Sequence, residues 1–145
     1  MNNNNRIAKA EIDIDAPKNR VWDALVTPAR IKEYMFGTNV ATDWREGSPI
    51  TWKGEWEGKK YEDKGVIRKV QPDRLLQYTH YSPLAGEPDK PENYHTVTVE
   101  LSGHNGYTHV ALSQDNNPTE EACAHSAENW KVMLTSMKNL LEKTR

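Results

Sequence analysis

Cysteine is nearly absent from this chain of 145 residues: Cys123 is the only one, so no internal disulfide can form. Long apolar runs are missing as well, and none approaches the roughly 20 residues that a membrane-spanning helix requires. Residues 1–5 lack the basic start and the apolar core of a secretory signal. We therefore expect a cytoplasmic protein without membrane insertion, in which residues 1–5 form a disordered tail.

An excess of charge of one sign is also lacking, since 19 basic residues stand against 21 acidic ones. A nearly neutral chain has no positive field to attract nucleic acid, so no nucleic-acid partner is expected. Aliphatic side chains are scarce, and Leu, Ile, Val and Phe make up only 25 residues. Five Trp, six Tyr and four Met supply the apolar volume instead. Because a buried Trp or Tyr covers about 150–250 Å², a sizeable core remains possible.

The short motifs of common catalytic centres are missing too. The sequence has no Gly-x-Ser-x-Gly elbow and no glycine-rich phosphate loop. Its five histidines do not have the spacing of a zinc site, so we expect neither a metal nor a cofactor. Cys123 falls on an apolar helix seam and is interpreted as a small buried hydrophobe. No residue is therefore assigned a catalytic role from motifs.

The apolar pattern predicts a strand, two short helices, a run of strands and one long helix. Alternation over residues 6–14 indicates a half-buried strand, and Pro17 and Pro28 are placed to begin two short helices. Strand-like runs separated by turns follow at residues 50–56, 61–70, 74–82, 96–101 and 108–114. Residues 82–92 hold three prolines and are expected to form a flap.

The last segment reads as an amphipathic helix that begins after Pro118. Its apolar seam consists of Cys123, Ala127, Trp130, Leu134, Met137 and Leu141. No second domain and no repeat is evident, so residues 6–145 are expected to form one domain.

Four pieces of the chain carry a resemblance to a known family. They are Ile14–Pro17 with Val21–Leu25, Gly65–Ile67 with Val70–Leu75, Gly106–Leu112, and Asn129-Trp130 with Leu134 and Met137. In this order and spacing, from about residue 6 to 143, the sequence resembles the family of activator-of-heat-shock-protein-90-ATPase homologue-like proteins. That family belongs to the START-like superfamily, also called Bet v 1-like or SRPBCC.

The resemblance implies an α+β helix-grip fold. In this fold a strongly bent antiparallel sheet wraps around the long C-terminal helix, and two short helices follow the first strand. It also implies a cavity between sheet and helix for a small hydrophobic molecule. Members of the superfamily include lipid and steroid carriers and cyclases.

Nine residues are candidates for lining such a cavity. Trp52 and Trp56 share one strand face, with Gly54 between them leaving room. On the long helix the candidates are Trp130, Met133, Leu134 and Met137, and on the other strands they are Tyr78, His80 and His95. Plain core packing is the alternative for the helix residues, and a satisfied, partly exposed histidine is the alternative for His80 and His95.

These features favour a cavity protein that binds a small hydrophobic or aromatic molecule without catalysis. One alternative is an enzyme of the cyclase or dehydratase type, with His80 or His95 as acid or base. Convergent polar groups about 3 Å apart in the cavity would favour that alternative. Another is a chaperone-linked role in the stress response, for which the family name is weak support.

Overall fold

A computed structural model describes residues 6–143 of the chain, so the predicted tail at residues 1–5 lies outside the described residues. The elements in chain order are β1 (Arg6–Ile14), α1 (Lys18–Val26), α2 (Pro28–Tyr34), β2 (Asn39–Ala41), β3 (Pro49–Trp56), β4 (Lys59–Gln71), β5 (Leu75–His80), η1 (Pro83–Ala85), η2 (Pro91–Asn93), β6 (His95–His104), β7 (Tyr107–Asn117) and α3 (Glu120–Lys143). Among these residues, no helix is both long and apolar enough to cross a membrane.

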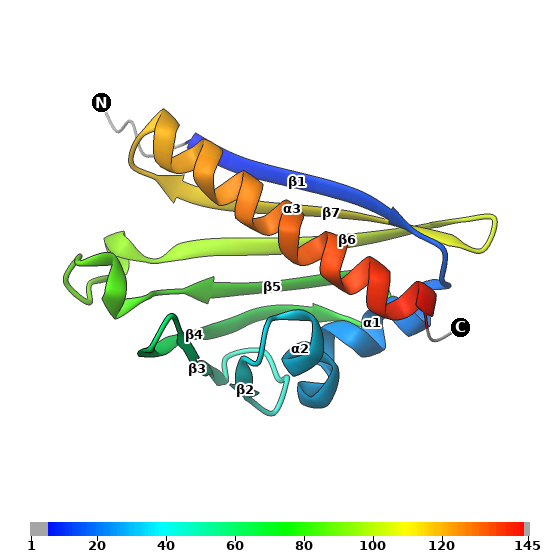
Figure 1. Cartoon of the computed structure of the whole chain (residues 1–145), viewed down its shortest axis with the longest axis horizontal. Coiled ribbons are helices and arrows are strands. Elements are labelled where there is room, and N and C mark those ends of the chain that lie inside the picture. The colour runs from blue at the N-terminus through cyan, green and yellow to red at the C-terminus, as the bar shows by residue number, and fades with distance from the viewer. Residues whose placement is uncertain (1–5, 144–145) are drawn as a thin grey trace.

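All seven strands form one antiparallel sheet in the order β1-β7-β6-β5-β4-β3-β2. The long helix α3 runs diagonally across one face of this sheet (Figure 1). The short helices α1 and α2 lie beside the C-terminal end of α3. The predicted α+β helix-grip fold is therefore confirmed. Pro17 directly precedes α1, and Pro28 is the first residue of α2, as expected. The three-residue strand β2 was not predicted, because it is too short to show alternation.

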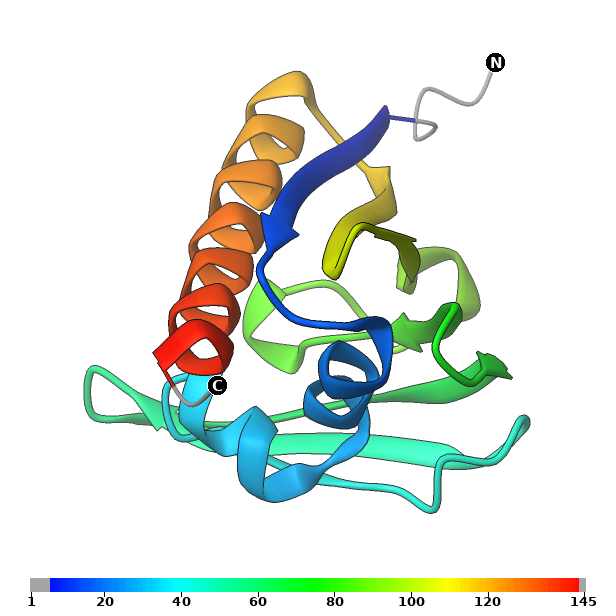
Figure 2. The same ribbon diagram turned by 90° about the vertical axis from the view of Figure 1, so that its right-hand side faces the viewer.

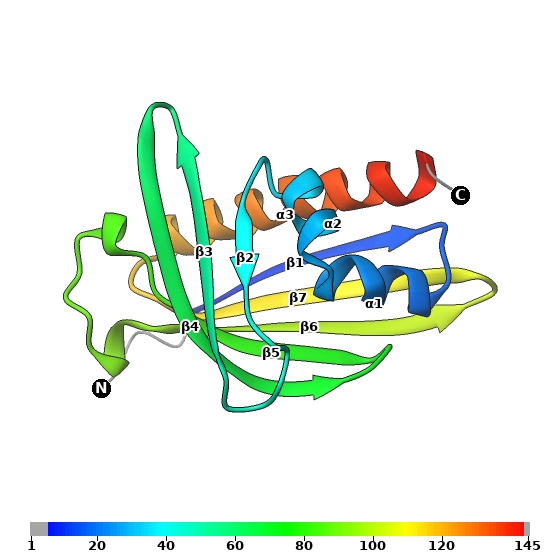
Figure 3. The ribbon, with the colours of Figure 1, turned by 90° about the horizontal axis from the view of Figure 1, so that it is seen from below.

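The sheet bends sharply within β4. Seen from below, β3 and the first half of β4 rise steeply away from the plane of β6 and β7 (Figure 3). At the bend, Gly65 lies so close to β5 that a Cβ atom there would stand 1.7 Å from the Thr79 carbonyl oxygen. The backbone N–H of Val66 donates to the Thr79 hydroxyl at 2.9 Å. The side chain of Thr79 thus replaces a regular ladder bond where the strand turns.

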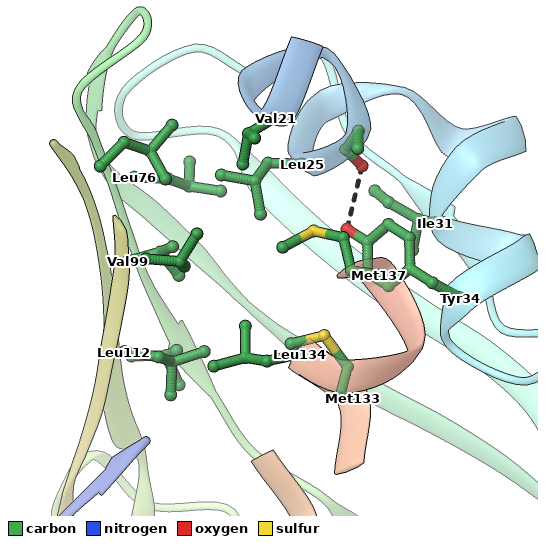
Figure 4. Close-up of a cluster of buried hydrophobic side chains, with 14 of the residues drawn as sticks. Val21, Leu25, Ile31, Tyr34, Leu76, Val99, Leu112, Met133, Leu134 and Met137 are labelled. Atoms are coloured by element: carbon green, nitrogen blue, oxygen red, sulfur yellow. Dashed lines mark hydrogen bonds between the residues drawn. The ribbon is translucent and has the colours of Figure 1, made fainter. Parts of the chain in front are cut away.

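The C-terminal half of α3 supplies the centre of the core. Leu134, Met137 and Leu141 are fully buried, and Leu134 points from the helix toward Leu112 of β7 (Figure 4). The Tyr34 hydroxyl donates to the carbonyl oxygen of Ala24 at 2.9 Å, which ties α2 to α1. Burial raises the pKa of this phenol far above its usual range, so the group remains a neutral donor. Cys123, interpreted as buried from the sequence, is only half-buried, because the first turns of α3 extend past the core.

Side chains of α3 also cover the free edge of β1, which lies beside the helix (Figure 2). Lys131 Nζ donates to the Glu11 carbonyl oxygen, and Lys138 Nζ donates to that of Asp13 at 2.8 Å. The backbone N–H of Asp15 donates to Glu142 at 2.9 Å. Because an open strand edge invites pairing with another chain, these contacts protect β1 from edge-to-edge association.

The lack of room for a side chain at Gly65 gives the first prediction. Gly65→Ala should lower the free energy of unfolding by about 1–3 kcal/mol, because backbone on β5 cannot move aside as a side chain could. Gly103→Ala is the control, since its Cβ would meet only the flexible Lys18 side chain at 3.1 Å. Urea denaturation of both variants measures the difference, and equal stability of the two would contradict this account of the bend.

A histidine on the outer face of β7 gives a pH-dependent prediction. His109 hydrogen-bonds Asp13 through Nδ1 and Glu11 through Nε2, both at 2.7 Å, and these bonds raise its pKa. Because the folded-state pKa lies above the unfolded value near 6.5, the stabilisation is complete below that pH and is lost as the pH rises through the folded value.

His109→Gln should therefore be less stable than the unmodified chain at pH 6 and equally stable at pH 9. The difference should stay below about 1 kcal/mol because the groups are exposed. Denaturation at both pH values measures it, with His104→Gln at the end of β6 as the control. A difference that persists unchanged at pH 9 would show that the imidazolium is not its source.

Candidate ligand-binding groove

Three adjoining cavities lie between α3 and the bent sheet. The apolar cavity, of about 330 Å³, is lined by residues that include Met35, Phe36, Tyr61, Trp130 and Met133. The central cavity, of about 490 Å³, is lined by residues that include Trp52, Tyr61, Asp63, Tyr78, His80 and Trp130. The polar cavity, of about 390 Å³, is lined by residues that include His80, Glu87, Glu92, His95, Asn116 and Ser126.

Shared walls make these cavities one groove. Tyr61 and Trp130 line both the apolar and the central cavity, and His80 lines both the central and the polar cavity. The groove therefore runs from an apolar end at Phe36, near α2, to a polar end at His95, at the start of β6.

Aromatic rings form one wall of the central cavity. The Trp52 ring lies 5.1 Å from the ring of Tyr78 and meets the His80 ring edge-on at 5.0 Å. Such contacts hold the three rings in fixed orientations. Burial raises the pKa of Tyr78 well above its usual range, so its hydroxyl stays protonated.

The ring of Tyr61 lies over Gly54, which has no side chain to displace it. Gly54 pairs with Tyr61 across β3 and β4, and a Cβ at Gly54 would stand only 2.4 Å from the Tyr61 hydroxyl oxygen. That hydroxyl lies 2.5 Å from Thr38 Oγ1, which itself donates to the Met35 carbonyl oxygen at 2.8 Å. The Tyr61 hydroxyl is consequently the donor to Thr38. The space that Gly54 provides, expected for a ligand, holds this ring.

Trp130 contributes its ring to the groove and its N–H to the fold. The indole Nε1 donates to Gln114 Oε1 at 2.6 Å, and the amide group of Gln114 donates to Asn117 at 3.3 Å. Gln114 is buried on β7 and therefore fixes the position of the indole. The Trp130 N–H is thus occupied, and the residue is only half-buried rather than enclosed in the core.

A histidine–carboxylate pair stands where the central and polar cavities meet. His80 Nε2 lies 2.9 Å from Asp63 Oδ2, and the two side chains are 25% and 16% exposed. Since the carboxylate accepts, Nε2 carries the proton, which leaves Nδ1 of a neutral ring as an acceptor. The second oxygen of Asp63, Oδ1, is shielded from solvent and has no hydrogen-bond partner.

His95 lies directly opposite His80 on the neighbouring strand β6. Its Nδ1 donates to the Asp115 carbonyl oxygen at 2.9 Å, so Nε2 of the neutral ring is an acceptor. Within residues 6–143, no three His, Cys, Asp or Glu side chains come together as a metal-binding group. His80 and His95, in their neutral forms, thus each keep one ring nitrogen as an acceptor.

The structure separates the predicted site residues into two sets. Those that line the groove are Trp52, Tyr78, His80, His95, Trp130 and Met133. Leu134 and Met137 are fully buried in the core and line none of the three cavities. Trp56 ends β3, but its side chain lies outside the part that the structure describes. Ligand contact by any of these residues stays a prediction.

Several lining residues were missed in the sequence, above all Tyr61 and Asp63. They lie in a polar stretch at residues 59–64 where no apolar alternation marks an inner face. The signal is pairing: Asp63 lies opposite Trp52 and Tyr61 opposite Gly54, so all four share one face. That register was not available before the structure.

The fold and the groove define a START-like protein with a helix-grip architecture. Residues 15–142 match the family described as "Activator of Hsp90 ATPase homolog 1-like protein", and the chain belongs to this family. No curated protein is significantly similar to the chain.

Solved structures agree with this assignment. The solution structure of ChR145 from Cytophaga hutchinsonii is 54% identical, with a TM-score of 0.83 over 95% of this chain and 94% of that one. The Aha1 dimer from Colwellia psychrerythraea is 21% identical, with a TM-score of 0.72 over 94% and 96%. DynU16, a putative protein in the dynemicin biosynthetic locus, is 15% identical, with a TM-score of 0.80 over 97% and 48%. The latter two show likeness of fold alone.

The Trp130–Gln114 hydrogen bond gives the prediction of this subsection. Trp130→Phe should lower the free energy of unfolding by about 1–3 kcal/mol, because the buried Gln114 oxygen loses its donor. A double-mutant cycle with Gln114→Met should give a coupling energy of about 1 kcal/mol or more. Denaturation of the single and double variants measures this energy. Additive effects would show that the bond contributes nothing to stability.

Proposed function

We propose that the protein binds a small, largely apolar molecule in the groove between α3 and the bent sheet. The observation that carries this proposal is the lining of the central cavity by Trp52, Tyr61, Tyr78 and Trp130. Its volume of about 490 Å³ falls in the range of about 300–1,000 Å³ typical of small-molecule sites. The family's fold supports the same proposal.

The ring system of the ligand would lie among these four aromatic side chains. Met35 and Met133 add flexible apolar surface at the apolar end, which suits a site that accepts related shapes. The Trp130 N–H does not bind the ligand, because it already donates a hydrogen bond to Gln114. Specificity then comes from the polar end, where a few fixed groups orient the ligand.

Titration with a panel of aromatic and lipid-like compounds tests the proposal. A compound present at a hundredfold excess over its Kd should raise stability by about 2.7 kcal/mol, detected as a higher Tm and as quenched Trp fluorescence. Tyr61→Ala should weaken binding, whereas Tyr107→Ala, a control on the exposed β6–β7 hairpin, should not. Absence of any Tm shift across the whole panel would refute the proposal.

A second candidate is acid–base catalysis of the cyclase or dehydratase type. The observation that favours it is the pair of His80 and Asp63, in which Nε2 and Oδ2 lie 2.9 Å apart within the groove. A carboxylate that orients an imidazole is a common arrangement for proton transfer. The same titration separates the candidates: a carrier returns its ligand unchanged, whereas an enzyme converts it and loses this activity in His80→Ala.

A chaperone-linked, stress-related role has less support. Large exposed apolar side chains in the described part come from six separate segments: Ile7, Phe36, Val66, Leu84, Tyr107 and Val132.

A further inference from the structure

The charge of the groove is of one sign. Among the residues that the structure describes, no lysine or arginine lines any of the three cavities. Three acidic residues do: Asp63 in the central cavity, and Glu87 and Glu92 in the polar cavity. This contrasts with the nearly balanced charge of the whole chain. A ligand that enters the groove therefore meets acidic residues with no lysine or arginine in the lining.

Asp63 is the carboxylate with the least access to water. Its side chain is 16% exposed, its Oδ2 accepts from His80, and its Oδ1 has no partner. Lys64, the next residue, pairs with Asp89 in the flap instead. A shielded carboxylate oxygen without a donor is destabilising for the free protein, and a positive charge bound beside the carboxylate would offset part of that cost.

The surroundings of Asp63 also favour positive charge. Trp52 lies directly opposite Asp63 across β3 and β4, and Tyr61 and Tyr78 line the same cavity. The faces of such rings attract cations, and this attraction adds to that of the carboxylate. An ammonium group brings several N–H donors and no acceptor, which suits the carboxylate of Asp63.

From this arrangement we infer that the groove selects organic cations: amines, protonated at neutral pH, that are carried on an aromatic or aliphatic body. The ammonium group lies at Asp63 and the body extends toward Trp130 and Met133. The inference rests on the proposed function and narrows its ligand class. A carboxylate ligand is disfavoured, because it would lose its hydration beside Asp63 with no lysine or arginine in the lining to replace it.

Three compounds of one shape and different charge test the inference at pH 7: 1-naphthylmethylamine, 1-naphthalenemethanol and 1-naphthoate. We expect the amine to bind at least about tenfold more tightly than the alcohol, because a charge-assisted hydrogen bond contributes more than a neutral one. The naphthoate should bind most weakly. Kd values come from Trp fluorescence titration.

Two matched variants assign the effect to Asp63. Asp63→Asn retains an oxygen that can accept from His80 but removes the charge, so amine affinity should fall by about tenfold while the alcohol changes little. Glu62→Gln removes the same charge from the adjacent, exposed residue on the other face of β4 and should change neither. If Asp63→Asn does not fold, the Kd values of the three compounds for the unmodified chain still test the inference.

The outcomes separate the inference from the function beneath it. Equal affinity for amine and alcohol, tighter binding of naphthoate, or an amine affinity unchanged in Asp63→Asn would each overturn the inference while the groove remains a binding site. If none of the three compounds nor any member of the panel binds, the proposed function fails together with the inference.

Discussion

The bend of β4 at Gly65 is the constraint on which the groove depends. A strand with a side chain at this position could not approach the Thr79 carbonyl oxygen, and the sheet would continue more nearly flat. Because it bends, the first half of β4 and its partner β3 rise beside α3 (Figure 3). Trp52, Tyr61 and Asp63 of these strands then line one cavity together with Trp130 of the helix. Glycine at a sharp bend in a strand is thus a condition for the site as well as for the sheet.

Along α3 the same helix face serves two purposes. Its C-terminal half carries the fully buried Leu134 and Met137, and these side chains fill the space beneath α1 and α2 (Figure 4). Its N-terminal half carries the half-buried Trp130, which stands over the open groove. In a chain with few aliphatic residues, large side chains with polar atoms do both tasks. Their N–H and O–H groups need partners, and Gln114 and Thr38 provide them.

Much of the fold could be predicted from the sequence, and less of the groove. Alternation in β1 and the apolar seam of α3 are strong because one face is buried and the other is not. The first half of β4 shows no such contrast, because its inner face lines a cavity and carries Tyr61 and Asp63. Only the register with β3 reveals which side these residues occupy. Apolar patterns in a sequence indicate which residues are buried. They do not identify polar residues that line an open groove.

A buried oxygen atom without a hydrogen-bond partner lies in the wall of this groove. Natural folds satisfy most buried polar groups, and where one is left without a partner a functional reason is often found. Here the buried side-chain atom without a partner, in the described part, is Asp63 Oδ1, in the wall of the central cavity. It adjoins His80, whose orientation depends on the same carboxylate. A mutation that optimised stability at Asp63 would therefore remove the group that fixes His80, so stability and the proposed recognition of a ligand oppose each other at this residue.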